Sequence, residues 1–381
     1  MTETNRNQSA SVGPLHGIRV IDFTIVMAGP MCTRALADAG ADVIKIESPS
    51  GDIVRHRPPI RACGSTYFAA MNCGKRSVVL DLSTEAGKAA ARELIASADI
   101  VVENFRPGVM KRLGLEYENL CKLNPRLVYC SISGFGQSGP LAQSAAYAPV
   151  IHAASGYDMA YMGYQSDSEK PPNNGIFLAD VLGSAHGFSA ILLALFDRER
   201  TGLGQNIDLS LLDCVLGSLI YEVQAAQFPS DKPRQVYQPV RARDGYVMVA
   251  AVTPKNMETL FDIVGFAQGK TDPRFSTVAA KEENWAALLG IIEQWTILRP
   301  AAECESTFMA AGVPCSRYRT VGEAINDPHI VERRLLETMG EQDPFCVVNQ
   351  AYKLSRSRLV ARQCVPALGE HTDEVLKEIS H

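Results

Sequence analysis

The first half of the chain alternates short β-branched runs with helix-like segments, and this alternation restricts the fold more than any other feature. The pattern predicts a strand at IRVIDFT (18–24), a helix at GPMCTRALADAG (29–40) and a second strand at DVIKIES (42–48). Parallel strands joined by helices are the economical arrangement for such a βαβ pattern. We therefore predict an α/β protein with a doubly wound sheet.

The alternation continues along the chain. It predicts further strands at 76–82, 99–105 and 126–133, a helix with Ser83 as N-cap, and a long helix from about Asn174 to Arg200. Past residue 225 the chain becomes rich in proline and charge, as a connection between domains does. A smaller region then begins at YVMVAAV (246–252), with helical segments at about 254–264, 282–297 and 300–311.

A length of 381 residues favours about two domains. The apolar content of 46% is enough to build a sizeable core. We predict a large domain over 1–225, a smaller α/β domain over 226–330, and a C-terminal segment over 331–381.

Charge and cysteine usage exclude several classes of protein. The net charge is −5 and the basic residues are spread out, which argues against a DNA- or RNA-binding surface. The 10 cysteines form no CxxC pair and no cluster with histidine at metal-ligand spacing, so we expect reduced thiols and no metal site. The polar start and the lack of an apolar run of about 20 residues indicate a cytoplasmic protein, with no membrane partner.

GFGQSG (134–139) matches the G-x-G-x-x-G pattern of dinucleotide-binding sites. In such a site the turn runs directly into a helix whose N-terminus faces the pyrophosphate. Here Pro140 follows at once and the next residues form helices poorly, so we expect neither a nicotinamide nor a flavin. A glycine-rich loop beside another ligand stays compatible with this sequence.

NNGIFLADVLGSAHG (173–187) places one acid, Asp180, in an apolar run. An unpaired buried carboxylate is unfavourable, so such an acid is paired, exposed or used in chemistry. At helical spacing it shares a face with Gly183, Ser184 and Gly187, which predicts an open groove beside a nucleophilic carboxylate. The alternative is an acid that stabilises a helix N-terminus by ~0.3–1 kcal/mol, and the pattern alone does not separate the two.

No histidine is placed to serve Asp180 as a base. His186 follows six residues later and lies near the opposite side of the helix. No Ser or Cys stands in a G-x-S-x-G context, so Ser/His/Asp and Cys/His hydrolysis are not expected.

Several basic residues admit two interpretations. VVENFRPGVMKRLG carries Arg106 and Arg112 beyond a strand end, where arginines of open α/β sheets meet phosphates, or where they are simply solvated. The same two interpretations apply to GKRS (74–77). In the connection, Arg241 and Arg243 either bind the second carboxylate of a dicarboxylic acid or lie in a solvated loop.

Taken together, these segments resemble the family III CoA-transferases, the group that contains formyl-CoA transferase and the carnitine CoA-transferases. The resemblance runs in order from about residue 14 to 376. The matching stretches are LHGIRVIDFT with AGP, LADAGADVIKIESPSGD, NCGKRSVVLDL, ADIVVENFRPG, NPRLVYCSISGFGQSGP, LADVLGS, ALFDRERTGLGQNIDLSLLD, DPRF, GVPC, DPHI and LGEHTDEVL.

The resemblance implies a fold and an activity. Members have a Rossmann-like large domain, built from the N-terminal part and the returning tail, and a smaller domain between them. Two ring-like protomers interlock as a homodimer. They move CoA from an acyl-CoA to a free carboxylic acid through an aspartyl-CoA thioester, and the nucleophile of the family falls on Asp180.

The resemblance also implies ten positions that contact CoA, which would be present as the acyl-CoA substrate. They are Val26, Met27, Ala28, Leu80, Ser83, Asn104, Phe105, Arg106, Arg112 and Tyr147. Three departures from formyl-CoA transferase argue against oxalate and formate as the substrate pair. Met27 replaces a glutamine, Ser48 replaces an arginine, and QPVRARDG (238–245) lacks the glycine run that closes over the active site.

Two alternatives stay open. The superfamily includes 2-methylacyl-CoA racemases, which use a histidine and an acid after the glycine loop for proton transfer at carbon 2. This chain has Tyr147 and Ala148 there, and His152 is out of register. The other alternative is a non-catalytic acyl-CoA-binding protein.

Overall fold

A computed structural model describes residues 13–62, 64–165, 168–230, 234–359 and 361–379, so the polar start of the chain and Cys63 lie outside the described residues. The chain divides into two compact units. The larger unit combines the described residues up to Gln227 with those from Val331 onward, and the smaller unit is Phe228–Ile330.

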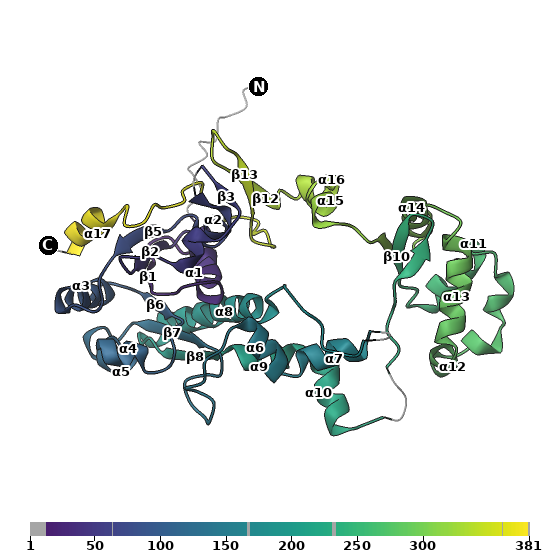
Figure 1. Ribbon diagram of the computed structural model, residues 1–381, viewed down its shortest axis with the longest axis horizontal. Coiled ribbons are helices and arrows are strands. Elements are labelled where there is room, and N and C mark those ends of the chain that lie inside the picture. Colours follow the sequence, from purple (N-terminus) through teal and green to yellow (C-terminus); the bar gives the residue numbers. More distant parts are fainter. Residues whose placement is uncertain (1–12, 63, 166–167, 231–233, 360, 380–381) are drawn as a thin grey trace. The chain divides into compact units, whose positions relative to one another are not determined.

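The larger unit is built on a six-stranded sheet in which all neighbouring strands are parallel (Figure 1). Its strands are β1 (Arg19–Asp22), β2 (Asp42–Glu47), β5 (Arg76–Val79), β6 (Ile100–Glu103), β7 (Val128–Ser133) and β8 (Asn206–Ser210). The predicted α/β class with a parallel central sheet is confirmed. The strand order is β5-β2-β1-β6-β7-β8, so the chain winds outward in both directions and changes direction between β1 and β6. Ligands of such sheets bind at this switch, beyond the carboxyl ends of the strands.

Helices cover both faces of the sheet. The helices of the larger unit are α1 (Ala28–Asp38), α2 (Thr66–Asn72), α3 (Glu85–Ala96), α4 (Val109–Leu113), α5 (Tyr117–Leu123), α6 (Ala148–Ala154), α7 (Tyr157–Gly163), α8 (Leu178–Thr201), α9 (Leu211–Ser218), α10 (Ile220–Gln227) and α17 (Thr372–Ile379). Of these, α7 and α10 pack on other helices and not on the sheet. Alternating residues of a strand serve opposite faces. Val20 belongs to the core shared with α1 and α8, whereas Ile21 belongs to the core shared with α3, α5 and α17.

The C-terminal segment of the larger unit ties onto the edge strand β5. The N–H of His371 donates to the carbonyl of Ser77 at 2.9 Å, and the hydroxyl of Thr372 accepts from the N–H of Val79 at 3.0 Å. Gly369 has a φ of 70°, which favours glycine, and lies against Val79. LGEHT is therefore the turn that covers a sheet edge.

Short elements complete the larger unit. They are the 3₁₀-helix η1 (Ile53–His56), the two-stranded sheet of β3 (Ile60–Arg61) and β4 (Gly64–Ser65), and the hairpin of β12 (Leu336–Met339) and β13 (Phe345–Val348).

Helix α8 crosses the core of the larger unit beside α1 (Figure 1). An 18-residue window of it has a mean hydropathy of 1.6, so by length and composition it is apolar enough to span a membrane. The prediction that no apolar run is long enough is therefore wrong for this helix. Its buried residues, among them Ala179 and Ile191, pack in the core against the sheet, whereas other apolar residues of this helix are exposed.

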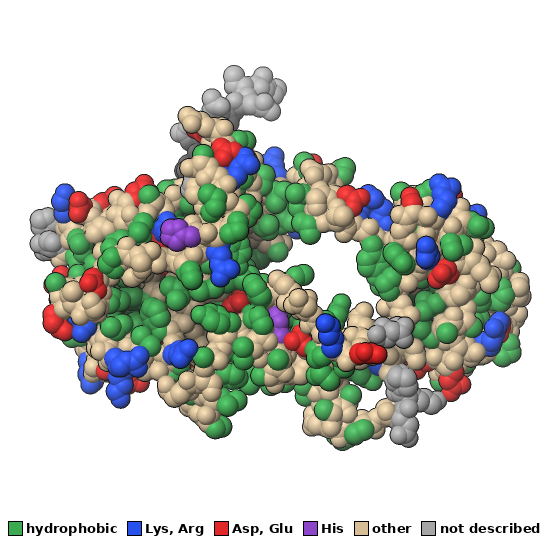
Figure 2. All heavy atoms as spheres, viewed as in Figure 1, with side chains coloured by type: hydrophobic (Ala, Val, Ile, Leu, Met, Phe, Trp, Pro, Cys, Tyr) green, Lys and Arg blue, Asp and Glu red, His purple; other side chains and the backbone are tan. Residues whose placement is uncertain are grey.

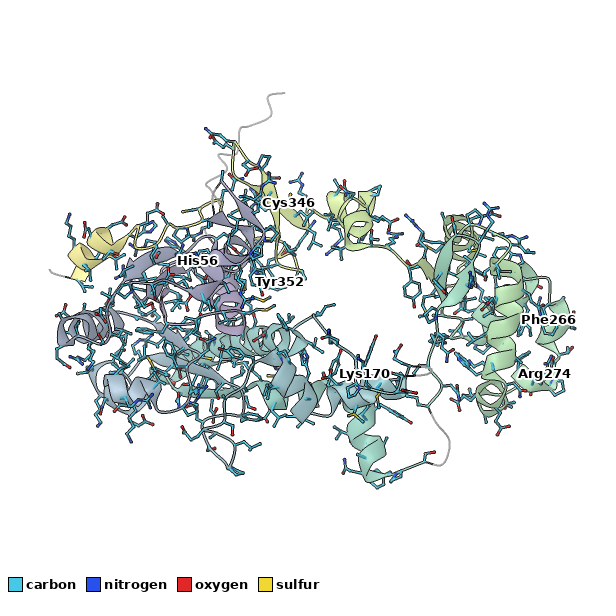
Figure 3. All side chains as sticks on the ribbon, viewed as in Figure 1. His56, Lys170, Phe266, Arg274, Cys346 and Tyr352 are labelled. Carbon is cyan, nitrogen blue, oxygen red and sulfur yellow. The ribbon has the colours of Figure 1, made fainter. Side chains whose placement is uncertain are left out.

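The smaller unit has its own antiparallel sheet, core and helices. Its strands are β9 (Val240–Ala242), β10 (Gly245–Val249) and β11 (Cys315–Arg317), in the order β11-β10-β9. Its helices are α11 (Pro254–Ile263), η2 (Ala267–Lys270), η3 (Pro273–Phe275), α12 (Val278–Glu283), α13 (Trp285–Thr296), α14 (Ala301–Ala310) and α15 (Val321–Ile325), and α16 (Pro328–Glu332) spans the boundary. Phe266, which is labelled in Figure 3, packs edge-on against Phe261. Arg241 and Arg243 are exposed.

Candidate active site

Asp180 is the third residue of α8, because the helix begins at Leu178 and not at the predicted Asn174. The Asn174 side chain instead accepts from the N–H of Ile176 at 2.9 Å, which forms a turn ahead of the helix. Asp180 therefore lies in the first turn, where free N–H groups and the helix dipole favour a negative charge.

The Asp180 side chain is half-buried, and its environment changes its acidity. Burial raises the pKa of Asp180 to about 6, while hydrogen bonding from the backbone N–H of Ala28 lowers it. The group is mainly ionised at neutral pH and only partly solvated. This is a suitable state for a carboxylate nucleophile.

The small residues that share a face with Asp180 do not form the predicted open groove. Gly183, Ser184 and Gly187 are buried. A Cβ atom on Gly183 would clash with the side chain of Leu211, and one on Gly187 would lie 3.2 Å from the sulfur of Cys32. The prediction is wrong for Gly183 and Gly187, because they let α9 and α1 pack closely against α8, whereas Ser184 lines a groove on another side of the helix.

The space beside Asp180 lies instead at the end of the helix. A cavity of about 340 Å³, the strand-edge cavity, opens where the sheet changes direction, between the segments that follow β1, β6 and β7. Asp180 lines it together with seven of the ten residues predicted to contact CoA: Val26, Met27, Ala28, Asn104, Phe105, Arg106 and Tyr147.

The other three predicted residues do not line this cavity. Leu80 is 6% exposed in the core, and its N–H donates to the carbonyl of Glu47 at 2.9 Å. Ser83 is exposed and its hydroxyl donates to Asp81 at 2.6 Å. Arg112 is exposed on α4. Their contact with CoA stays a prediction.

A second cavity, the apolar cavity, also meets Asp180 and has a volume of about 790 Å³. It shares Val26, Met27 and Tyr147 with the strand-edge cavity. Its other walls are Ile53, Val54, Arg57, Pro58, Tyr67, Ala148, Pro149, Gly175, Ile176, Phe177 and Val181. Arg57 is the one cation among these described residues.

Sequence reasoning missed the residues of the apolar cavity. Tyr67 lies in α2, a helix that was not predicted, and its hydroxyl lies 3.5 Å from the sulfur of Met27. Burial and the charge of Asp180 raise the pKa of Tyr67, while Arg57 lowers it, so the three groups interact electrostatically. Arg57 and Tyr67 are ten positions apart in the sequence, and a cation and an aromatic residue at that separation form no pattern that identifies a site.

His152 supports the start of α8. It is 1% exposed, and its Nε2 atom accepts from the N–H of Ala179 at 3.1 Å. Burial lowers the pKa of His152, which favours the neutral form that can accept this bond. His152 is thus a structural neighbour of Asp180, and it lines neither the strand-edge nor the apolar cavity.

The two cations of the GKRS segment are paired with acids of the larger unit. The ammonium group of Lys75 is fully buried and donates to Asp22 at 3.0 Å and to Asn72 at 2.7 Å. Arg76 pairs with Asp42 at 2.6 Å and with Glu378 at 2.6 Å. Both cations are therefore part of the structure of the sheet.

The GFGQSG loop leads into an irregular segment, and the next helix, α6, begins at Ala148. The N–H of Gln137 donates to the carboxylate of Asp208 at 2.9 Å, whereas Gly134 lines the strand-edge cavity.

Within the described part of the chain, no group of three His, Cys, Asp or Glu side chains is arranged to hold a metal ion. Each described cysteine is a free thiol.

Comparisons with known proteins point to one family. The model of CoA-transferase family III matches residues 15–372. The chain is 38% identical to the acetyl-CoA:oxalate CoA-transferase of Acetobacter aceti, over 89% of this chain and 89% of that protein. It is 33% identical to the succinate–glutarate CoA-transferase of Agrobacterium fabrum, over 96% of each. The crystal structure of a CAIB/BAIF family protein from Brucella suis superposes with a TM-score of 0.83 at 32% identity, over 97% of this chain and 100% of that one.

Proposed function

Because the chain belongs to CoA-transferase family III and is an enzyme that transfers CoA, we propose that Asp180 is its nucleophile and carries CoA as an aspartyl thioester. The observation that supports this role is the place of Asp180 at the junction of the strand-edge and apolar cavities. A group that must react with both CoA and an acyl carbon needs access to both compartments.

The first half-reaction transfers CoA to the enzyme. A carboxylate oxygen of Asp180 attacks the thioester carbonyl, the C–S bond breaks, and the CoA thiolate leaves a mixed anhydride. The thiolate then attacks the aspartyl carbonyl carbon of this anhydride. The donor acid departs as a carboxylate, and Asp180 holds CoA as a thioester.

The second half-reaction reverses these steps with another acid. The acceptor carboxylate attacks the aspartyl thioester and releases the thiolate, which then attacks the acceptor carbonyl of the new anhydride. A new acyl-CoA forms and the Asp180 carboxylate is regenerated. Each step exchanges bonds of similar energy, so the cycle needs no separate source of energy. The N–H of Ala28 and the helix N-terminus are placed to stabilise negative charge on the reacting carboxyl.

We assign the strand-edge cavity to CoA and the apolar cavity to the acyl group. Arg106 lies at the strand-edge cavity, where a guanidinium suits the phosphates of CoA. Arg57 lies in the apolar cavity, where it suits a second carboxylate of the acyl group. Two relatives are named for oxalate and for succinate and glutarate, all dicarboxylic acids. A dicarboxylic acid with an apolar chain is the substrate that these walls favour.

We further propose an interlocked homodimer in the cytoplasm. Leu193 and Phe196 of α8 are 71% and 68% exposed, and Ile220 of α10 is 76% exposed. A groove beside α8 of about 970 Å³ is lined by Phe188, Leu192 and Tyr352, of which Tyr352 is labelled in Figure 3. Figure 2 shows broad areas of hydrophobic side chains on the surface of the larger unit. Apolar surface of this extent is typical of a surface that a second copy covers. Light scattering should give the mass of a dimer, and a monomer would contradict the proposal.

Mass spectrometry tests the chemistry. The protein is incubated with a panel of acyl-CoA donors without an acceptor, and peptides are searched for CoA attached to Asp180. An adduct on this residue that disappears when an acceptor acid is added supports the mechanism. An adduct elsewhere, or transfer by Asp180→Asn at the wild-type rate, contradicts it. Deuterium incorporation at carbon 2 without an acceptor would instead indicate a racemase.

A further inference from the structure

The turn of residues 24–27, between β1 and α1, has an unusual backbone. Val26 has a φ of 68°, in the left-handed region that β-branched residues rarely adopt. Such strain persists only where surrounding groups hold it, and it concentrates at functional sites. Val26 and Met27 line both cavities, and the N–H of Ala28, which follows the turn, lies against Asp180.

The side chain of Asn104 holds one residue of this turn from both sides. Its Nδ2 group donates to the carbonyl of Ile25 at 2.8 Å, and its Oδ1 atom accepts from the N–H of Ile25 at 2.8 Å. Asn104 follows β6, the strand next to β1 in the sheet. Both ends of its amide are engaged by the protein backbone.

A buried ion pair holds the residues on either side of Ile25. The ammonium group of Lys45 is 0% exposed and donates to the carbonyl of Thr24 at 2.7 Å and to Asp52 at 3.1 Å. The other oxygen of Asp52 accepts from the N–H of Val26 at 3.4 Å. Three consecutive residues of the turn are thus fastened by side chains from three other segments.

We infer that Asn104 is a positioning residue, which acts with the Lys45–Asp52 pair to hold the strained turn and so aim the N–H of Ala28 at Asp180. This inference rests on the proposed function of Asp180. It differs from a contact role for Asn104, because a residue that only binds CoA need not bond both polar groups of Ile25. Asn104 is half-buried, so its substitution leaves the cores of the larger unit intact.

The test replaces Asn104 with alanine and measures kcat, KM and their pH dependence. We expect kcat to fall about tenfold and KM for the acyl-CoA to change less than about twofold. The acid limb of the kcat profile should move to higher pH, because Asp180 loses the N–H that lowers its pKa. The other groups around Asp180 are Arg57, Tyr67, Arg106 and Tyr147, and none of them is altered.

Asn119→Ala is the matched control, because Asn119 is exposed on α5 and its side chain bonds the nearby Glu116. It should leave both kcat and the pH profile unchanged. Asn104→Asp places a carboxylate oxygen opposite the carbonyl of Ile25 and adds a negative charge to the cavity that Asp180 lines, so it should not restore the wild-type kcat. Thermal melting of each variant separates a loss of folding from a loss of positioning.

Val26→Gly supplies a rescue experiment. Glycine adopts a φ of 68° without strain, so a turn that carries this substitution needs less support. The loss caused by Asn104→Ala should therefore shrink to about threefold or less in the Val26→Gly background. Two outcomes would overturn the inference. One is that Asn104→Ala raises KM and leaves the pH profile unchanged, and the other is that it lowers kcat by the same factor in the wild-type and Val26→Gly backgrounds. Either outcome would leave the adduct on Asp180, so this failure is distinguishable from failure of the proposed function.

Discussion

The two cavities that meet at Asp180 are built from different kinds of structure. The strand-edge cavity is formed by segments that directly follow strands of the parallel sheet. Apart from the residues that it shares with the strand-edge cavity, the apolar cavity is lined by residues in or beside η1, α2, the start of α6 and the start of α8, which lie outside the sheet. The shape of the strand-edge cavity therefore depends on the fold of the sheet, whereas the shape of the apolar cavity depends on individual side chains. We therefore expect the strand-edge cavity to serve all donors alike and the apolar cavity to select among acids.

The largest effect should come from the residue that the two cavities share. Asp180→Asn keeps the size of the side chain and removes the nucleophile, so transfer from every donor should fall at least about 10³-fold. CoA should still bind to this variant, as measured by calorimetry. A selective loss with one donor only would show that Asp180 belongs to the apolar cavity and not to both.

The next effect should separate the two cavities. Arg57→Met should lower kcat/KM for dicarboxylic acceptors about 10- to 100-fold and leave monocarboxylic acceptors unchanged, because one charge-assisted contact is lost. Arg106→Met is the matched substitution in the strand-edge cavity, and it should raise KM for all acyl-CoA donors alike. Steady-state kinetics with paired mono- and dicarboxylic acids measure both. If Arg57→Met lowered kcat/KM equally for mono- and dicarboxylic acceptors, Arg57 would not select dicarboxylic acids.

The pH dependence should be common to both cavities. The attacking form of Asp180 is the carboxylate, and the pKa of Asp180 is raised to about 6. The kcat/KM for the donor should therefore fall about tenfold for each pH unit below 6, whichever acid is used. If the pH of the acid limb changed with the acceptor acid, the titrating group would be on the substrate and not Asp180.

The smallest effect concerns stability. An acid whose pKa is raised on folding stabilises the protein at low pH, and this contribution is lost as the pH rises through about 6. Asp180→Asn should therefore increase the free energy of unfolding at pH 7 by about 1–3 kcal/mol and leave it nearly unchanged at pH 4. Urea denaturation at the two pH values measures the difference. An equal increase in the free energy of unfolding at both pH values would indicate better packing of the variant and not the removal of an unfavourable charge.

Much of the fold could be predicted from the alternation of strands and helices, but some elements could not. β8 (Asn206–Ser210) was missed because NIDLS is short and half-exposed, and its pairing with β7 is a long-range contact. α2 was missed because STYFAAMN lacks a strong helical pattern, although Ser65 caps it by accepting from the N–H of Phe68 at 3.0 Å. Short elements of this kind depend on tertiary packing more than on local preference.

The sequence by itself determined the parallel α/β class, the family and the unusual acid in the apolar run that begins α8. These follow from periodicity and from motifs, which are local in the chain. Only the tertiary structure decided that Gly183 and Gly187 accommodate neighbouring helices, that Lys75 is a buried partner of Asp22, and that Asn104 holds Ile25. Whether a small residue, a cation or an amide serves a ligand or the fold depends on what lies beside it in space. That neighbour comes from a distant part of the chain.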